Sequence, residues 1–299
     1  MRHVTLSVLL AVATLGAAGR AALATPFEPK MIPEQVQAVG HLDVDALRRT
    51  QLFAAAGGQA AIDAALDQAP PQMRPVARAL AATLRGVSFW HAADHGAVYL
   101  VTRDAKSLGQ LIAKLPATPG QPIDGFPTYT IDAHGKPHFA GIYGDTLVVA
   151  DSEDSLQQSI HVLAGHAASL AGSKALPLSS RQGVFVFVTL GDHLLGAIQK
   201  TASSKMLQLG LRSVVLDVGE AAGQLTATAH AEMRSADAVQ KATSMLEGLR
   251  AMASLSDDPM AQTLIDGVTV TGGGNAVDVV AKLPVSLVAK IIQNHHHAK

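Results

Sequence analysis

The chain lacks cysteine altogether, and only 4% of its 299 residues are aromatic. The absence of cysteine excludes disulfides, thiolate metal ligands, a cysteine nucleophile and a lipid anchor on an N-terminal cysteine. The charges of the two signs are also nearly equal in number, because 23 Lys and Arg residues against 24 Asp and Glu residues leave a formal net charge of −1. This balance provides no global field that would attract nucleic acid. With 48% hydrophobic residues, the chain has enough apolar surface for a packed core and does not belong to the disordered class.

The first 24 residues have the pattern of a secretory signal peptide. A short positive start precedes residues 4–18, which are uncharged and rich in Val, Leu and Ala. This run of about 15 residues is shorter than the ~20 that a bilayer-spanning helix needs. Ala22-Leu23-Ala24 supplies the small residues that signal peptidase accepts, so we expect cleavage after Ala24 or, because Arg20 interrupts the region, after Ala18. The mature chain is expected to be periplasmic or secreted.

Strand patterns alternate with amphipathic helix patterns beyond an extended lead-in at residues 25–35, which contains three prolines. Strands are predicted at 36–42, 86–91, 97–103, 128–132, 137–143, 146–150, 183–190, 211–218, 224–233, 268–270 and 277–279. Helices are predicted at 46–56, 59–69, 73–85, 105–115, 153–163, 192–198, 236–249, 259–264 and 284–292.

A stretch rich in Ala, Ser and Gly at residues 164–182 indicates a linker between two units. The units comprise residues 36–163 and 183–293, and a histidine-containing tail, 294–299, follows them. Both run in the order strand, helix, hairpin, helix, strands, helix, which indicates an internal duplication. The predicted fold class is α+β: two similar halves, each a mostly antiparallel sheet with helices packed on one face.

Short stretches of the two halves also match, namely AVGHLDVDALRR with VFVTLGDHLLGA and LRGVSFW with LRSVVLD. In this order of elements behind a signal peptide, the chain resembles exported bacterial proteins with duplicated α+β repeats. The resemblance covers most of residues 33–293 and consists of apolar patterns. It implies fold and location, and it transfers no activity and no functional residue.

Motifs that carry known chemistry are missing from the sequence. There is no G-x-S-x-G elbow, no H-E-x-x-H, no Walker-type phosphate loop and no G-x-G-x-x-G before a helix. Gly272-Gly273-Gly274 lies between two alternating strands, so we interpret it as a hairpin turn. The acid pair Asp43/Asp45 stands at a helix start, where capping accounts for it. The sequence therefore favours a non-catalytic protein with no cofactor.

Histidine is the compositional exception, with 13 residues. His91 and His95, with Asp94 between them, and His134 and His138 share the spacing H-x₃-H. In a tight loop this spacing could bring two imidazoles and an aspartate oxygen onto one divalent metal ion. No third ligand follows at a fixed spacing, and exposed turn histidines are the alternative interpretation.

Further histidines stand at the tail and at the start of each half. The tail, which contains Asn294-His295-His296-His297, is capable of weak and unselective metal binding. His41 and His193 stand near the first strand–helix junction of each half. We interpret both as side chains that hydrogen-bond to backbone.

The leading hypothesis is an exported, non-catalytic envelope protein that binds a small ligand or a protein partner. The alternative is a metal-dependent hydrolase or metal-binding protein that uses His91, Asp94 and His95, or His134 and His138. A third hypothesis gives the two halves a structural role, in which they clamp another envelope protein.

Overall fold

The computed structural model describes residues 25–69, 71, 74–93, 95–133, 136–174, 176–178, 183–201 and 210–297. The chain divides into two compact units. Unit 1 contains the residues up to Val36 together with His41–Ser173. Unit 2 contains Gln37–Gly40 and the residues from Lys174 onward, so the division lies within the predicted linker. The predicted signal peptide lies outside the described residues.

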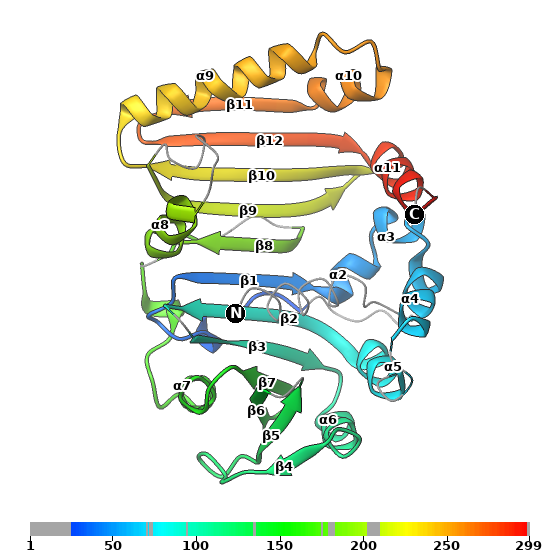
Figure 1. Ribbon diagram of the computed structural model, residues 1–299, viewed down its shortest axis with the longest axis vertical. Helices are drawn as coiled ribbons and strands as arrows, with labels where there is room; N and C mark the ends of the chain where they lie inside the picture. Colours follow the sequence, from blue (N-terminus) through cyan, green and yellow to red (C-terminus); the bar gives the residue numbers. More distant parts are fainter. Residues whose placement is uncertain are drawn as a thin grey trace. The chain divides into compact units, whose positions relative to one another are not determined.

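Unit 1 is built on an antiparallel sheet (Figure 1). Its strands are β1 (Ala38–Asp43, of which the first half belongs to unit 2), β2 (Leu84–Ala92), β3 (His95–Thr102), β4 (Ala117–Pro119), β5 (Thr128–Ala133), β6 (Lys136–Tyr143) and β7 (Thr146–Ala150). Their order across the sheet is β1-β2-β3-β7-β6-β5-β4. Its helices are η1 (Pro29–Met31), α2 (Val44–Arg48), α3 (Gln51–Ala55), α4 (Gly58–Asp67), α5 (Arg74–Thr83), α6 (Ala105–Ile112), α7 (Glu153–Leu163) and η2 (Leu170–Gly172).

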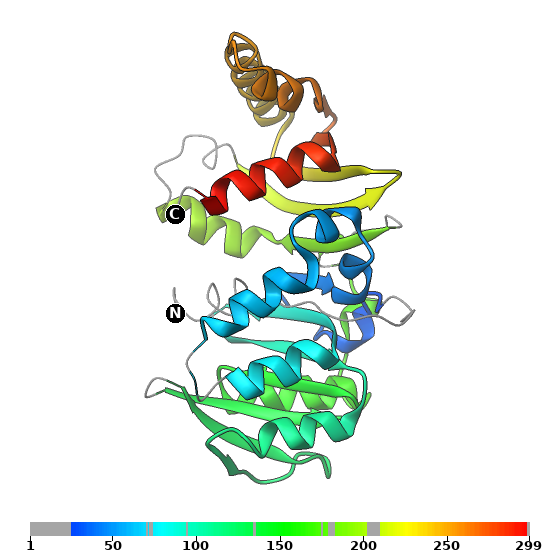
Figure 2. The same cartoon turned by 90° about the vertical axis from the view of Figure 1, so that its right-hand side faces the viewer.

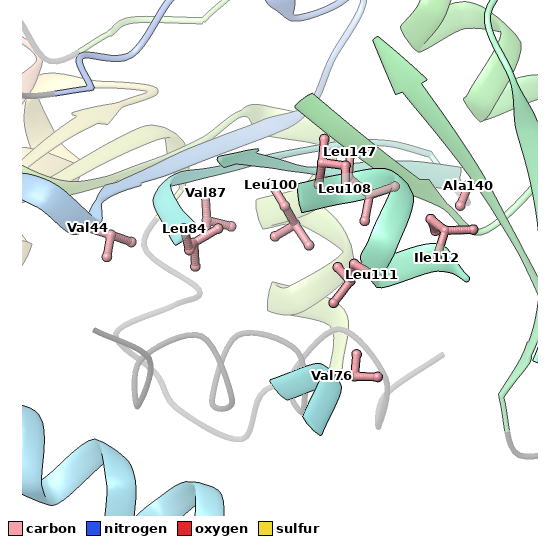
Figure 3. Packing of buried hydrophobic residues seen from close by; sticks show 10 residues of the cluster. All are labelled: Val44, Val76, Leu84, Val87, Leu100, Leu108, Leu111, Ile112, Ala140 and Leu147. Atoms are coloured by element: carbon pink, nitrogen blue, oxygen red, sulfur yellow. The ribbon is translucent and has the colours of Figure 1, made fainter. Parts of the chain in front are cut away.

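Helix α6 covers one face of this sheet. Leu108, Leu111 and Ile112 form one stripe of the helix, which is buried in a cluster with Leu100 and Leu147 of the strands (Figure 3). Helix α5 lies beside α6, as the cyan and blue-green helices of Figure 2 show. Burial of such leucine side chains contributes roughly 1.5–3 kcal/mol each, so this cluster is a main source of the stability of unit 1.

Helix α7 covers the opposite face. A methyl group on Gly141 would lie 2.9 Å from Ile160 Cδ1, so α7 packs closely on β6. Gly141 pairs with Val148 and Val148 with Tyr99, and residues opposite each other on paired strands share a face. Leu147, which packs with α6, precedes Val148 and must point the other way. Unit 1 thus has helices on both faces of its sheet, which differs from the expected single helical face.

The predicted lead-in is packed into unit 1. Ile32 is 0% exposed and its carbonyl accepts a hydrogen bond from Leu170 N. Pro33 and Ser169 form an isolated bridge, so the start of the linker 164–182 pairs with the lead-in. Both segments therefore contribute backbone contacts to unit 1.

The strands of unit 2 also pair antiparallel (Figure 1). Its strands are β8 (Val184–Leu190), β9 (Leu211–Ala221), β10 (Gln224–Met233), β11 (Val268–Gly273) and β12 (Ala276–Pro284), in the order β11-β12-β10-β9-β8. Its helices are α8 (Asp192–Thr201), α9 (Ala236–Ala253), α10 (Pro259–Asp266) and α11 (Val285–His297). The backbone of the predicted histidine tail is thus part of α11 as far as His297.

Helix α9 packs on the apolar face of β10–β12. Val239 and Ala242 of the helix form a buried cluster with Val277 of β12, and Val270 packs against it. The opposite face of the same strands is polar, and Thr269, Thr271, Asp278 and Lys282 are exposed there. This alternation is the usual pattern of an antiparallel sheet with one solvated face.

The α+β fold class is confirmed, and the predicted elements occur with small shifts at their ends. One predicted helix, 46–56, is divided into α2 and α3. Thr50 separates them because its hydroxyl accepts from Phe53 N at 3.0 Å and donates to Leu47 O at 2.6 Å, which starts a new helix. Within the described part of the chain, no helix combines the length and apolarity that crossing a bilayer requires.

Candidate functional site

The first predicted histidine pair lies on the β2–β3 hairpin. His91 pairs with Gly96, and Ala92 pairs with His95. Because successive strand residues point to opposite faces, His91 and His95 lie on opposite faces of the sheet. The His95 ring lies edge-on to Trp90, with centroids 5.8 Å apart. The sheet register therefore does not bring the two imidazoles together, and Asp94 lies outside the described residues.

His138, from the second predicted pair, lies on β6 opposite Ile131. It shares a sheet face with His91, but strands β3 and β7 lie between their strands. Three strand spacings correspond to roughly 14 Å, too far for one metal ion to be shared. His134 lies outside the described residues. Among those that are described, no group of three His, Cys, Asp or Glu side chains is arranged to hold a metal ion.

Other histidines contact carboxylates that are distant in the sequence. Asp124 Oδ2 lies 2.9 Å from His166 Nδ1 and 3.7 Å from His161 Nε2 in unit 1. In unit 2, His230 Nδ1 lies 2.7 Å from Asp278 Oδ1 across β10 and β12. These pairs are partly exposed, so each contributes little to stability. Only the cross-strand pair had a local signal, namely polar residues on the solvent face of two alternating strands.

His41 is buried in β1 and both of its ring nitrogens have partners. Nε2 lies 2.9 Å from the carbonyl oxygen of Thr25, and Nδ1 lies 2.9 Å from Ser88 Oγ. A carbonyl only accepts, so Nε2 carries the proton and Nδ1 accepts from the Ser88 hydroxyl. Burial lowers the pKa of His41 to about 4. The hydrogen bond to the Thr25 carbonyl raises the pKa, but by less. The ring is therefore neutral at physiological pH and has a positioning role, as the backbone-bonded interpretation predicts. His193 is exposed on α8.

Asp45 is the centre of a buried ion network, the arginine cluster, formed with Arg48, Arg85 and Arg103. The Asp45 side chain is 2% exposed, and the three guanidinium groups lie 3.1–3.2 Å from its oxygens. Arg48 also donates to the carbonyls of Leu84 and Ala81. Burial lowers the pKa of Arg48, and the charge of Asp45 opposes this effect.

The arginine cluster connects three parts of the chain. Arg48 is in α2, Arg85 in β2 and Arg103 directly follows β3. One carboxylate thus ties the β1–α2 junction to the β2–β3 hairpin. Interpreting Asp45 as a helix-start residue missed this role, because Arg85 and Arg103 lie 40 and 58 residues away from it and no spacing rule relates them.

Asp43 caps α2 and also accepts a hydrogen bond from the backbone of Thr25. Its Oδ1 accepts from Ala46 N at 2.7 Å, and its Oδ2 accepts from Thr25 N at 3.0 Å. Burial raises the pKa of the Asp43 carboxyl, while the two amide hydrogen bonds and the charge of Arg49 oppose the rise. Asp43, rather than Asp45, is therefore the helix cap.

The end of helix α9 exposes large apolar side chains. Leu249 and Met252 of α9 and Leu255, which follows the C-cap Ser254, are 46%, 63% and 81% exposed, respectively, and we refer to these three residues as the apolar end of α9. Val239, Ala242 and Leu246 in the first part of the helix pack against β11 and β12. Leu249 continues this stripe beyond the packed part. Contiguous exposed apolar groups mark interaction sites in soluble proteins.

Comparisons with known proteins support the fold alone. No protein-family model and no curated protein matches the chain. Its fold is similar to three crystal structures of the protein TP0453. Crystal forms III, IV and I match with TM-scores of 0.52, 0.53 and 0.51 at 8%, 9% and 10% identity. Each match covers 90% of this chain and 97–99% of the other. The arrangement of elements therefore occurs in a solved structure over nearly its whole length.

Proposed function

We propose that the chain is an exported, non-catalytic envelope protein that binds a protein partner through the apolar end of α9. The observation that carries this proposal is the exposure of Leu249 and Met252 in the last turns of α9 and of Leu255 just beyond its end. Leaving such side chains in water forgoes the stabilisation of burial, so a partner that covers them would gain it.

A protein surface fits this feature better than a small ligand. Small-molecule sites are concave, whereas the apolar end of α9 projects from a helix. Apolar residues three positions apart, like Leu249 and Met252, are the anchors by which a helix binds in the groove of another protein. The flexible Met252 side chain suits such a contact because thioethers adapt to irregular surfaces.

The charges nearby favour a protein over a lipid surface. Three acidic residues near the apolar end in the sequence are exposed, namely Glu247, Asp257 and Asp258, and one basic residue, Arg250, is exposed among them. Helices that bind anionic membranes carry an excess of Lys and Arg on their polar side. An acidic rim would be repelled by anionic lipid and would suit a partner with basic residues around an apolar groove.

Export is the second part of the proposal. The positive start, the apolar run at 4–18 and Ala22-Leu23-Ala24 support a cleaved signal peptide. The repeat is a related proposal. Both units follow the order strand, helix, hairpin, helix, hairpin, helix after the insertions of unit 1 are set aside, which supports a duplication.

The test is site-specific photocrosslinking in intact cells. Met252→p-benzoylphenylalanine is expected to yield one discrete protein adduct. Lys241→p-benzoylphenylalanine is the matched control, because Lys241 is exposed on the packed half of the same helix. A triple variant, with Leu249, Met252 and Leu255 each changed to Ser, is expected to bind the partner at least tenfold more weakly and to melt like the wild type. Equal labelling from positions 252 and 241, or adducts with lipid alone, would overturn the proposal.

A further inference from the structure

Thr25 is held by contacts on three sides. Its N–H donates to Asp43 Oδ2 at 3.0 Å, and its carbonyl accepts from His41 Nε2 at 2.9 Å. A methyl group on Gly86 would lie 3.1 Å from Thr25 Cγ2, so the Thr25 side chain packs closely on Gly86. We refer to Asp43, His41 and Gly86 as the Thr25 seat.

The residue that this seat contacts, Thr25, is the one that follows the predicted cleavage site. The sequence places the cut after Ala24 from the small residues Ala22 and Ala24 alone. The structure independently surrounds residue 25 with a carboxylate and a hydrogen-bonding imidazole. We propose that the Thr25 seat is a binding site for the α-ammonium group that signal cleavage after Ala24 creates. This inference rests on the export part of the proposed function.

Cleavage of the Ala24–Thr25 bond creates the ammonium group that would bind to Asp43. Hydrolysis of the Ala24–Thr25 bond consumes one water molecule, leaving the new carboxylate on Ala24 and the new amine on Thr25. An α-amine with a pKa near 8 takes up a proton at neutral pH. The neutral N–H that donates to Asp43 thereby becomes a cation beside a carboxylate, and a charge-assisted hydrogen bond is roughly twice as strong as a neutral one.

The added positive charge would compensate the buried negative charge of Asp43. Asp43 is 4% exposed and is the N-cap of α2, so its negative charge is buried near the start of that helix. A buried charge is costly unless opposite charge lies near it. The charge of Arg49 already acts on this carboxyl, and an ammonium on Thr25 would add a cation in direct hydrogen-bond contact with it. The Thr25 hydroxyl oxygen is also buried and has no hydrogen-bond partner among the residues that the structure describes. An ammonium adds N–H donors next to this oxygen, where the amide of an uncleaved chain has one.

The consequence is that processing stabilises the folded state. The uncleaved chain offers Asp43 a neutral amide, and the mature chain offers it an ion pair. Cutting after Ala18 would leave six additional residues before Thr25 and would place the ammonium outside the seat.

The experiment compares three mature chains by thermal unfolding at pH 7. The first begins with a free Thr25, the second with N-acetyl-Thr25, and the third with Ala24 before Thr25. Acetylation keeps the N–H donor and removes the charge, so it isolates the ion pair. The free chain is expected to melt at least about 3 °C above the other two. In the Asp43→Asn background this difference should vanish, because the seat then carries no charge.

Three coincident melting curves in the wild-type background would overturn the inference, as would an equal difference in the Asp43→Asn background. The mass of the exported protein supplies a second measurement, which should correspond to a start at Thr25; a start at Gly19 would contradict it. Crosslinking from Met252 does not depend on the N-terminus, so the partner proposal and the Thr25 seat can fail separately.

Discussion

Neighbouring residues on single strands show how the two units differ. In β7 of unit 1, Leu147 and Val148 point to opposite faces and are 3% and 0% exposed. In β12 of unit 2, Val277 is 2% exposed, whereas the side chain of Asp278 next to it is 52% exposed. Unit 1 packs α6 and α7 on opposite faces of its sheet, and β10–β12 of unit 2 present one apolar face to α9.

The charged groups differ in the same way. In unit 1 the Asp45 carboxylate lies inside the fold with three arginines around it. In unit 2 the His230–Asp278 pair stands at the surface. A two-sided sheet buries whatever polar groups lie near it, so those groups need partners. The polar face of β10–β12 leaves such groups in water.

The largest expected effect comes from the buried carboxylate. Asp45→Asn leaves three arginines without their common anion and should destabilise unit 1 by about 3–5 kcal/mol. Asp278→Asn is the matched change at the surface and should cost under about 1 kcal/mol. Denaturant unfolding with hydrogen exchange at β2 and β3 measures both. Similar losses for the two variants would remove the distinction between the units.

Truncating consecutive residues tests the two-sided burial. Leu147→Ala should cost about 2–5 kcal/mol, and Val148→Ala about 2 kcal/mol, since each buried methylene contributes roughly 0.8 kcal/mol. In unit 2, Val277→Ala should also cost about 2 kcal/mol, whereas Thr271→Ala on the polar face should change stability by under about 0.5 kcal/mol. Urea midpoints provide the measurement. A neutral Val148→Ala would show that the α7 face contributes little.

His41 should make unit 1 sensitive to acid. The pKa of His41 is about 4 in the folded chain, against an ordinary value of 6.5, so below pH 6.5 the unfolded chain binds a proton that the folded chain does not. Stability is therefore full above pH 6.5 and falls by about 3 kcal/mol as the pH drops to 4. His41→Gln should abolish this part of the pH dependence.

The exposed His193 of unit 2 provides the control for this measurement. His193→Gln should leave the difference in unfolding free energy between pH 7 and pH 4 unchanged. If both variants alter that difference equally, burial of His41 is not its cause.

The smallest expected difference between the units is in the effect on stability of replacing one glycine in each unit by alanine. Gly141→Ala in unit 1 would place a methyl group 2.9 Å from Ile160 Cδ1 and should cost about 1–3 kcal/mol. Gly248→Ala in α9 of unit 2 meets nothing within 4 Å and should stabilise the helix by about 0.5–1 kcal/mol. Melting temperatures that move in opposite directions would support the contrast, and a stabilising Gly141→Ala would contradict it.

Local patterns predicted most of the elements, because their causes lie within a few residues. The spacing of Leu108, Leu111 and Ile112 indicates α6, and Ser152 and Ser235, residue types that favour N-caps, cap α7 and α9. The second helical face of unit 1 was missed. Its signal is the continuous apolar runs at 97–101 and 147–150, which are typical of strands buried on both faces.

Site residues were harder to predict than elements. His91 and His95 are four residues apart, but the pairing register alone decided that they face opposite ways. The sequence did not predict the exposure of the apolar end of α9, because Leu249 continues an apolar stripe of the kind that is normally buried. Only the extent of the sheet beneath the helix determines where that burial ends.

By itself, the sequence determined the positions of the helices and strands and the pattern of an export signal. These depend on side-chain periodicity, caps and turn residues, which act over short distances. The tertiary structure alone decided which polar groups meet, such as Asp45 with Arg85 and Arg103, and Asp43 with Thr25. Contacts between residues 18 to 58 positions apart follow from strand order and register, and no local rule encodes either.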